Sequence, residues 1–470
     1  MFWLGNVLLI ERQIIDIFKD ADAKQLNYIL SDFPIAHLFY KVKDHWMVRD
    51  YHRTQLLELL TVERLGVLTV KSRVMLIHGL QLKKLSANAR SENYCKNILL
   101  KTTGDQLSEL KCLTDSKGDY HNMHKLIYKD IRSPDIRNEL LAHFAKQAQV
   151  QRAHSLLGSR AGKKRSLYAW RKIVCDVDDT LVCSGGSFPA GMDTSYPKKE
   201  LYPGVLGFLR ELDLGTTKSS PTTIAPAASA QVSYYKHNKL ADLTNKVNYV
   251  WEENRLSNLV FLSARPHVYS DISEQMTYGK FENLRKNRGL HGNPTLLCGA
   301  LDTGAKFIVK NDMEPLAVTK FANYSEYSAI YPEFKVVFIG DNGQGDVRVS
   351  EMIMDSGADA MQGSLERVYI HLVQPLHKTH VKSDGLLCGT QSKNVCYFNT
   401  YVDAAVDALK HGLIQITGLR NVIEEAKFDV ELITPEGWSS AAKSSGGGGG
   451  GRLRDERVRE LNQSIHLANK

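Results

Sequence analysis

Short apolar runs bounded by polar or glycine-containing stretches recur through the middle of the chain and predict buried β-strands. Runs of this kind suit parallel strands that are covered on both faces. The segments between them have helical spacing, and alternation of strands with helices is typical of a doubly wound, Rossmann-like parallel sheet. We therefore predict an α/β domain over residues 166–430, with candidate strands at residues 173–177, 259–263, 294–299, 335–341 and 368–373.

The preceding residues, 1–165, show the three-to-four-residue spacing of amphipathic helices. The clearest case follows the segment Ser133-Pro134-Asp135, which reads as an N-cap, a proline at the first helical position and an acid in the first turn. The helix predicted to follow spans residues 136–149. We expect a mostly helical N-terminal domain with a targeting or regulatory role, ending in a linker or boundary loop at residues 158–165.

The first ten residues are apolar and have no basic residue before them. This stretch is too short to span a bilayer and has the wrong flanks for a signal peptide. Ile14, Ile15 and Phe18 continue its helical spacing. That spacing favours the first turns of a packed helix over an interfacial membrane contact.

Two stretches have a composition that does not suit a packed core. Residues 213–232 are rich in Thr, Ser, Pro and Ala and predict a disordered insertion. Two closing helices are predicted at residues 401–410 and 413–426. Residues 431–470 then predict a flexible linker with a glycine run, followed by a short basic amphipathic helix. That helix would dock on a partner, on an anionic membrane or on this protein itself, or remain solvated.

Composition narrows the class of protein. The chain has 470 residues, of which 43% are hydrophobic and 24% charged, as in ordinary soluble proteins. Its net charge of +8 suits an anionic membrane surface or phosphorylated substrates, and without zinc-finger spacing or an arginine-rich arm we predict no nucleic-acid partner. The seven cysteines include no CxxC pair, which indicates a reducing compartment. We expect a cytoplasmic protein, and the positive charge is compatible with a peripheral location at a membrane.

The first candidate strand ends in acids, Asp176 and Asp178. Ligands of open α/β sheets bind at the carboxyl ends of the strands. Residues two apart share a face of a strand, so both carboxyl groups can line one crevice there. This suits a carboxylate nucleophile with a carboxylic acid beside it. The alternative is a strand followed by an aspartate-rich turn.

Three later stretches favour the first interpretation. Ser263 follows the second apolar run, Lys320 lies in a later helical segment, and Asp341 and Asp346 follow the fourth run. The order acid pair, hydroxyl, lysine, acid pair resembles the four motifs of the haloacid-dehalogenase-like phosphatases. The segments DVDDT, FLSARP and FIGDNGQGD further resemble the catalytic domain of the actin-patch-associated phosphatidate phosphatases. The resemblance covers residues 170–375, apart from residues 213–258.

The resemblance implies a role for each motif. Asp176 would be the nucleophile and form an aspartyl-phosphate, and Asp178 would act as general acid and base. A magnesium ion would be held by the Asp176 side chain, the Asp178 backbone carbonyl and Asp341, with Asp346 as a further ligand or an orienting residue. Ser263 would donate a hydrogen bond to a phosphate oxygen. Lys320 would supply a positive charge, and Lys306 and Lys310 are the alternatives for that role. Thr180 and Arg265 would contact the substrate; the alternatives are that Thr180 shapes the turn and that Arg265 pairs with an acid.

The function implied by the resemblance is magnesium-dependent hydrolysis of phosphatidate to diacylglycerol and phosphate by a peripheral membrane enzyme. Two alternatives remain open. One is the same chemistry on a soluble or protein phosphomonoester, and the other is a non-catalytic protein that binds phosphatidate or acts as a scaffold. Intact acids at positions 176 and 178 count against the second, because a binder needs no acid–base pair.

Overall fold

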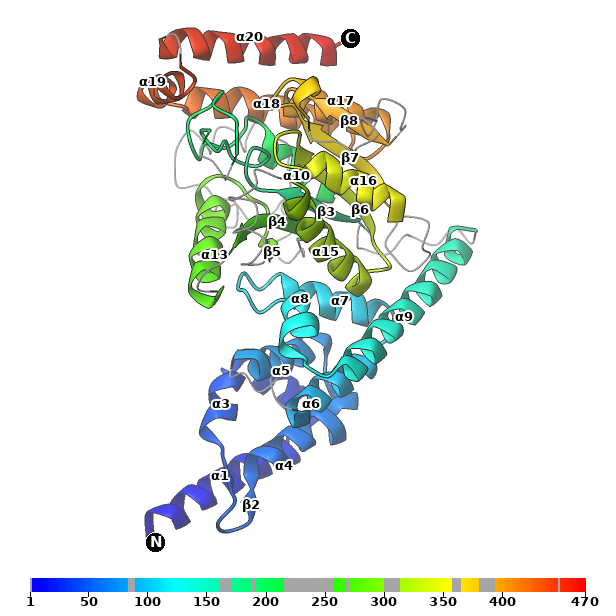
Figure 1. Cartoon of the computed structure of the whole chain (residues 1–470). Coiled ribbons are helices and arrows are strands. Elements are labelled where there is room, and N and C mark those ends of the chain that lie inside the picture. The colour runs from blue at the N-terminus through cyan, green and yellow to red at the C-terminus, as the bar shows by residue number, and fades with distance from the viewer. Residues whose placement is uncertain are drawn as a thin grey trace, which may run out of the picture. The chain divides into compact units, whose positions relative to one another are not determined.

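The computed structural model describes residues 2–82, 89–160, 171–186, 191–214, 257–266, 270–299, 313–356, 365–379, 394–446 and 449–470 (Figure 1). The chain divides into two compact units. The first unit consists of Met1–Arg165 with Ala329–Glu333, and the second of Ser166–Ser328 with Phe334–Lys470.

The second unit is built on a six-stranded parallel sheet. Its strand order is β5-β4-β3-β6-β7-β8, so the first strand of the unit lies in the interior and the chain continues to both sides of it. The prediction of an α/β, Rossmann-like fold with a parallel sheet is confirmed. The strands are β3 (Arg171–Asp176), β4 (Leu259–Pro266), β5 (Thr295–Gly299), β6 (Lys335–Asp341), β7 (Leu365–His371) and β8 (Val395–Phe398).

Helices cover the sheet. Helix α10 packs on β3 and against α17 and α18, whereas α16 packs on β6 and β7. Every residue of β3 is buried, as expected for a strand covered on both faces. The described helices of this unit are α10 (Val205–Leu214), α13 (Ser270–Asn287), α15 (Glu314–Ile330), α16 (Asp346–Ser356), α17 (Tyr401–Lys410), α18 (Ile416–Leu432), α19 (Pro435–Ser444) and α20 (Gly450–Ala468), with a short 3₁₀ turn, η5 (Leu376–Lys378).

Two expectations for this unit need correction. Strand β8 was not predicted, because four residues at the edge of a sheet give too short an apolar run. The linker predicted from residue 431 is instead helical over Pro435–Ser444. The reason is local: Thr434 caps that helix by accepting a hydrogen bond from the Gly437 N–H, and Trp438 is buried. Of the insertion predicted at residues 213–232, the first two residues end helix α10, and the rest lies outside the described residues.

The C-terminal helix α20 packs on this protein itself. It lies against α19, α17 and α18, and Leu461 and Ser464 are buried in that contact. The close approach explains a glycine at position 450, where a Cβ would lie 2.5 Å from the backbone nitrogen of Ser439. Of the alternatives left open by the sequence, docking on this protein is the one that the fold displays.

Helices and one small hairpin form the described part of the first unit. The helices are α1 (Phe2–Asp20), α2 (Ala23–Asp32), α3 (Ile35–Lys41), α4 (His52–Glu58), α5 (Val70–Leu82), α6 (Ala89–Leu100), α7 (Gly104–Asp115), α8 (Met123–Lys125) and α9 (Pro134–Arg160), with π-helical turns at Leu59–Glu63 and Leu126–Asp130 and a 3₁₀ turn at Leu65–Val67. The hairpin pairs β1 (Asp44–His45) with β2 (Asp50–Tyr51) and was not predicted.

Helix α9 begins as predicted and ends later than predicted. The Ile136 N–H donates to Ser133 Oγ at 3.3 Å, and Pro134 is the first helical residue. Leu140 and Phe144, four residues apart on one side of the helix, are fully buried. The helix continues to Arg160, so the expected linker at residues 158–165 is helical over its first three positions.

Helix α1 is likewise present but is less packed than predicted. Leu9 and Ile10 are each 55% exposed, whereas Phe18 is buried. The apolar start of the chain is therefore helical without being core at these two positions.

A buried lysine lies at the centre of a polar contact within the first unit. Lys111 Nζ is 2.7 Å from Glu333 Oε1 and donates to the backbone carbonyl of Ile330 at 2.8 Å. Ser108 Oγ donates to the same carboxylate at 2.6 Å. Glu333 belongs to the five-residue segment Ala329–Glu333, which begins with the last two residues of α15 and is part of the first unit.

Candidate functional site

Two neighbouring strands end in aspartates. Strand β3 ends at Asp176 and its neighbour β6 ends at Asp341, while α16 begins at Asp346. All three side chains are buried, and one oxygen from each lies within 4.8 Å of the others. We call Asp176, Asp341 and Asp346 the carboxylate cluster. It forms at the carboxyl ends of the strands, where parallel α/β sheets bind their ligands.

Helix α15 supplies a cation to this cluster. Lys320 Nζ lies 2.6 Å from Asp176 Oδ1 and 2.5 Å from Asp346 Oδ1, and the lysine is itself buried. Both contacts are charge-assisted hydrogen bonds. The structure thus brings Lys320 to the acids, as the motif order predicted, whereas its rivals Lys306 and Lys310 lie outside the described residues.

Burial dominates the electrostatics of the cluster. It raises the pKa of Asp176, the Asp346 carboxylate raises that pKa further, and Lys320 opposes both effects. Burial also raises the pKa of Asp341, with Asp346 adding to the effect. Burial lowers the pKa of Lys320, but the two carboxylates beside it outweigh that effect, and the net direction is upward. The lysine therefore stays charged, while ionising all the acids together is costly.

The cluster leaves two oxygens to be satisfied. Asp176 Oδ2 and Asp341 Oδ2 are buried and have no hydrogen-bond partner among the residues that the structure describes. Such atoms are costly unless something binds them. When ionised, the three carboxylates exceed the single lysine by two negative charges, which one divalent cation would balance. Carboxylate oxygens are ligands that Mg²⁺ prefers, so the residues fit a magnesium ion.

The loop after β6 donates hydrogen bonds to one carboxylate oxygen of Asp341, and the other oxygen has no partner among the described residues. Asp341 Oδ1 accepts hydrogen bonds from the N–H groups of Gly343, at 2.6 Å, and Gln344, at 3.1 Å. This is an Asx turn, which fixes the carboxylate. The strand also needs glycine at position 340, because a Cβ there would lie 2.5 Å from Asp346 Cβ. The turn and a metal-binding role are therefore compatible.

Asp179 shapes the loop that follows β3. Its φ of 57° lies in the left-handed region, which aspartate tolerates better than most residues. Its side chain accepts hydrogen bonds from the N–H groups of Ser184, at 2.8 Å, Met192, at 2.5 Å, and Asp193, at 3.0 Å. A carboxylate engaged in this way ties both ends of the loop together.

Asp178 and Thr180 lie on either side of that residue. Asp178 is buried two residues beyond the end of β3, where it forms an isolated β-bridge with Val182. Thr180 is also buried, and its carbonyl accepts a hydrogen bond from the Tyr401 hydroxyl at 2.6 Å. The Thr180 hydroxyl has no partner within the described parts of the chain. Its position therefore suits either turn shaping or a ligand contact.

The second motif lies on the other side of β3. Leu262 of β4 pairs with Asp176, so Ser263 follows at the same edge of the sheet. Ser263 is half-buried. Arg265 also belongs to β4, but its side chain is outside the described part of the structure. The structure thus places Ser263 one position beyond the partner of Asp176 on the neighbouring strand, and it does not place the Arg265 guanidinium.

Two polar residues near the site were not predicted. Asp193 accepts hydrogen bonds from the hydroxyls of Tyr202, at 2.5 Å, and Ser195, at 2.7 Å. His371 ends β7, and its Nδ1 lies 2.9 Å from the Asp179 carbonyl oxygen; burial lowers its pKa. His371 ends β7 in the structure but lies inside the apolar run predicted at residues 368–373, so the rule that found Asp176 does not single it out. Asp193 lies in an irregular loop and carries no such signal.

Two further observations concern membrane-spanning helices and similarity to known proteins. No helix among the described residues combines the length and the apolar character that crossing a membrane requires. Comparisons of the chain with protein-family models, with curated proteins and with solved structures give no match.

Proposed function

We propose that this chain is a magnesium-dependent phosphatidate phosphatase with a haloacid-dehalogenase-type catalytic unit. The observation that supports this most is the carboxylate cluster with Lys320 at the carboxyl ends of β3 and β6. Two of its oxygens, Asp176 Oδ2 and Asp341 Oδ2, have no partner among the described residues, and a site built for a divalent cation and a phosphate would leave such atoms available.

In the proposed reaction, Asp176 Oδ2 attacks the phosphorus and the bond to the glycerol oxygen breaks. Asp178 gives its proton to the departing alkoxide, which leaves as diacylglycerol. Water then attacks the aspartyl-phosphate, and Asp178 takes the proton that this water loses. Phosphate departs, and both aspartates return to their starting state.

A magnesium ion would be held by the Asp176 side chain, the Asp178 backbone carbonyl and Asp341, with Asp346 as a further ligand or an orienting residue. When bound, it supplies positive charge that screens the phosphate dianion from an anionic nucleophile. Lys320 orients Asp176 through its Oδ1, which leaves Oδ2 for attack, and contributes a fixed positive charge. Ser263, Thr180 and Arg265 are the proposed contacts to the substrate.

The lipid substrate is supported by the resemblance of residues 170–375, and the net charge of +8 is compatible with an anionic membrane surface. We propose a cytoplasmic, peripheral enzyme that reaches the headgroup from the water side. A soluble or protein phosphomonoester is the second candidate, because the same cluster would serve any phosphomonoester.

The test is phosphate release from phosphatidate in mixed micelles, with magnesium and with a chelator. We expect release by the wild type only with magnesium, and a loss of at least about 10³-fold in Asp178→Asn, because an amide can neither protonate the leaving alkoxide nor take a proton from water, whereas the backbone carbonyl at position 178 is unchanged. The control is Asp455→Asn, an exposed aspartate on α20, which should keep full activity.

The outcomes separate the candidates. Activity on a soluble phosphoester but not on phosphatidate keeps the chemistry and discards the lipid. Vesicle binding without turnover of either substrate supports the non-catalytic alternative. Full activity of Asp178→Asn would contradict the proposed mechanism.

A further inference from the structure

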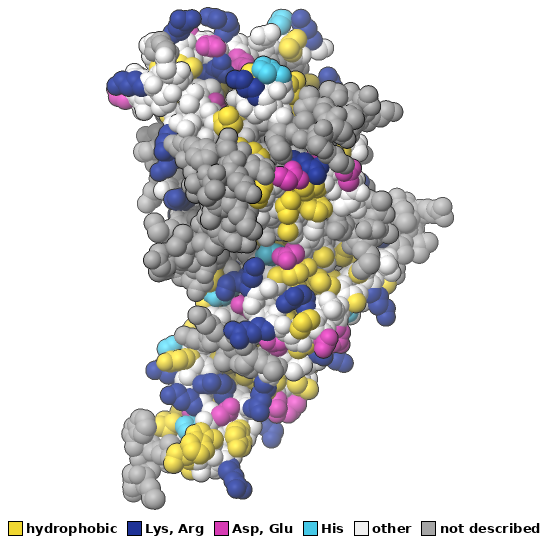
Figure 2. Space-filling model, in the orientation of Figure 1, with side chains coloured by type: hydrophobic (Ala, Val, Ile, Leu, Met, Phe, Trp, Pro, Cys, Tyr) yellow, Lys and Arg dark blue, Asp and Glu magenta, His cyan; other side chains and the backbone are white. Residues whose placement is uncertain are grey.

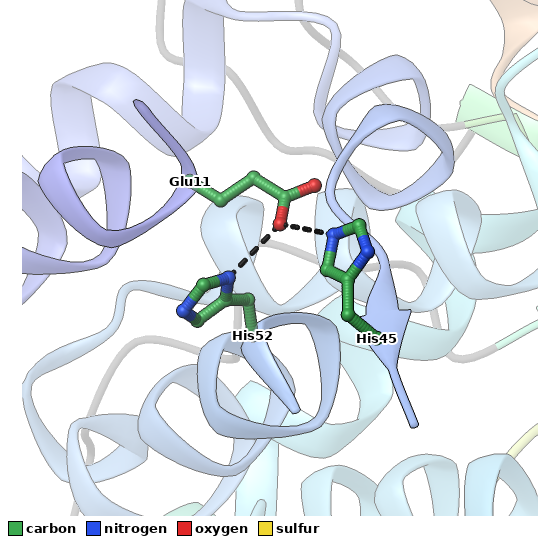
Figure 3. A group of neighbouring side chains, drawn as sticks. All are labelled: Glu11, His45 and His52. Carbon is green, nitrogen blue, oxygen red and sulfur yellow. Dashed lines mark hydrogen bonds and ion pairs between the residues drawn. The ribbon is translucent and has the colours of Figure 1, made fainter. Parts of the chain in front are cut away.

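Three side chains of metal-ligating type meet in the first unit. Glu11 comes from α1, His45 from β1 and His52 from the first position of α4. Figure 3 shows the Glu11 carboxylate between the two imidazole rings. Glu11 Oε2 lies 2.7 Å from His45 Nε2 and 2.9 Å from His52 Nδ1. We call these residues the Glu-His-His cluster.

The cluster has a buried interior and one accessible side. Glu11 and His52 are buried, whereas the His45 side chain is 16% exposed. The polar atoms of all three converge on one point from three separate elements. An ion could therefore enter beside His45, and water could complete its coordination there.

The dimensions of the cluster suit a small ion. Zinc binds imidazole nitrogen and carboxylate oxygen at about 2.0–2.2 Å, which sets neighbouring ligand atoms of a tetrahedron roughly 3.3 Å apart. The two contacts of Glu11 Oε2, at 2.7 and 2.9 Å, are about 0.4–0.6 Å shorter than that, and all three ligand atoms lie within 4.8 Å of one another. Binding zinc would therefore require the carboxylate and the two rings to move apart by about this amount.

We propose that Glu11, His45 and His52 form a zinc-binding site in the first unit. The ligand atoms are Glu11 Oε2, His45 Nε2 and His52 Nδ1, and a water molecule takes the fourth position. Two imidazoles and one carboxylate favour zinc over magnesium or calcium, which prefer oxygen ligands alone. The site is independent of the carboxylate cluster and of the function proposed for it.

The same contacts also describe a hydrogen-bonded carboxylate, with each imidazole N–H donating to Glu11. Glu11 Oε1 has a further partner, the Lys43 N–H at 3.1 Å. The two descriptions differ in the histidine tautomers. For zinc, the nitrogens that face Glu11 must be unprotonated, whereas for a hydrogen-bonded carboxylate they must carry the proton. A direct metal measurement therefore separates them.

A bound ion would join α1 to the hairpin and to the start of α4. The loop of that hairpin carries Trp46 and Met47, which are 75% and 79% exposed, directly after the ligand His45. Figure 2 shows exposed hydrophobic side chains gathered at the end of the first unit that carries the hairpin in Figure 1. The ion would fix the base of this exposed apolar loop, which the short β1–β2 pairing holds only at two positions.

The experiment is equilibrium dialysis of the full-length protein against zinc chloride, with the bound metal measured by mass spectrometry. The protein carries Asp341→Asn, and millimolar magnesium is present, so that the carboxylate cluster does not contribute. We expect one zinc ion bound per chain. Adding Glu11→Gln or His52→Ala should weaken binding by about 100-fold or more, since even changes outside the ligand shell cost 10–100-fold.

The design keeps folding and binding apart. Glu11→Gln keeps the size of the side chain and one oxygen acceptor for the imidazoles, but its amide NH₂ would face the Lys43 N–H, so the folding of this variant is verified by urea unfolding in chelator. His37→Ala, an exposed histidine on α3, is the matched control and should leave zinc binding unchanged. Zinc should also raise the melting temperature of the parent and not that of Glu11→Gln. Equal zinc binding by parent and Glu11→Gln, or no bound zinc in the parent, would overturn the proposal.

Discussion

The carboxylate cluster of the second unit and the Glu-His-His cluster of the first differ in how their buried negative charge is compensated. In the carboxylate cluster, three buried acids repel one another and share one lysine, and two of their oxygens have no partner among the described residues. In the Glu-His-His cluster, one buried acid lies between two imidazoles, and both of its oxygens accept hydrogen bonds.

The difference separates a site that needs a ligand from a site that tolerates one. Like charges held together in a buried place are stable only with a counter-charge. A carboxylate that already has donors is stable without an ion, and an ion replaces protons there. In chelator, the carboxylate cluster should therefore lower the free energy of unfolding, whereas the Glu-His-His cluster should raise it. Three substitutions test this contrast.

The largest effect is expected at the one cation of the carboxylate cluster. Lys320→Met keeps the length of the side chain and removes the charge that Asp176 and Asp346 share. Breaking a buried ion pair by removing one partner costs about 3–5 kcal/mol. We expect a loss of this size in the free energy of unfolding by urea, measured in chelator.

The matched control is Lys427→Met on α18, where Lys427 pairs with Glu424 and both side chains are more than 40% exposed. Such pairs contribute less than about 1 kcal/mol. A similar loss of stability in both variants would show that the Lys320 pair gains nothing from its burial.

A moderate effect is expected in the Glu-His-His cluster. His52→Ala removes one donor from the buried Glu11 carboxylate. Leaving such a group with an unmet hydrogen bond costs about 1–3 kcal/mol. Urea unfolding in chelator should show this loss in the first unit, whereas His37→Ala, at an exposed position, should change stability by less than about 0.5 kcal/mol. No loss in His52→Ala would mean that the carboxylate does not depend on its imidazole donors.

The third substitution should change the dependence of stability on pH. Burial raises the pKa of Asp341, so the folded protein holds this proton more tightly than the unfolded chain does. Stability is therefore expected to fall as pH rises from about 3.9, the ordinary aspartate value, towards the raised pKa. Asp341→Asn should make this slope shallower.

The measurement is urea unfolding in chelator at several pH values, for the wild type, Asp341→Asn and the exposed control Asp455→Asn. Magnesium should oppose the fall in the wild type, because it binds the ionised cluster. A slope that Asp341→Asn leaves unchanged would contradict the electrostatic account of the cluster.

Much of the second unit could be predicted from sequence because its signals are local. Asp176 and Asp341 each end an apolar run, and parallel strands bring their carboxyl ends to one edge without further information. Lys320 required the order of motifs as well, since lysine on a helix carries no signal of its own. The helix from Pro134 was predicted by its cap for the same local reason.

The rest depends on packing that spacing does not reveal. His45 and His52 are separated by a hairpin, and Glu11 lies on a helix far earlier in the chain. Only the tertiary structure brings them together. Strand β8 was missed because four edge residues gain their order from the neighbouring strand, and helix α19 because serine and alanine are ambiguous until Trp438 is buried.

Because the segment Ala329–Glu333 belongs to the first unit, folding of that unit cannot be completed until this later part of the chain has been synthesised. A ribosome adds about 5–20 residues per second, so Glu333 is made about ten to thirty seconds after residue 165. During that interval the N-terminal residues are complete in sequence, yet Lys111 lacks the carboxylate that it binds in the finished protein. The first unit therefore cannot reach its final structure before much of the second has been synthesised, and a fragment that stops at residue 165 should expose a lysine built to be buried.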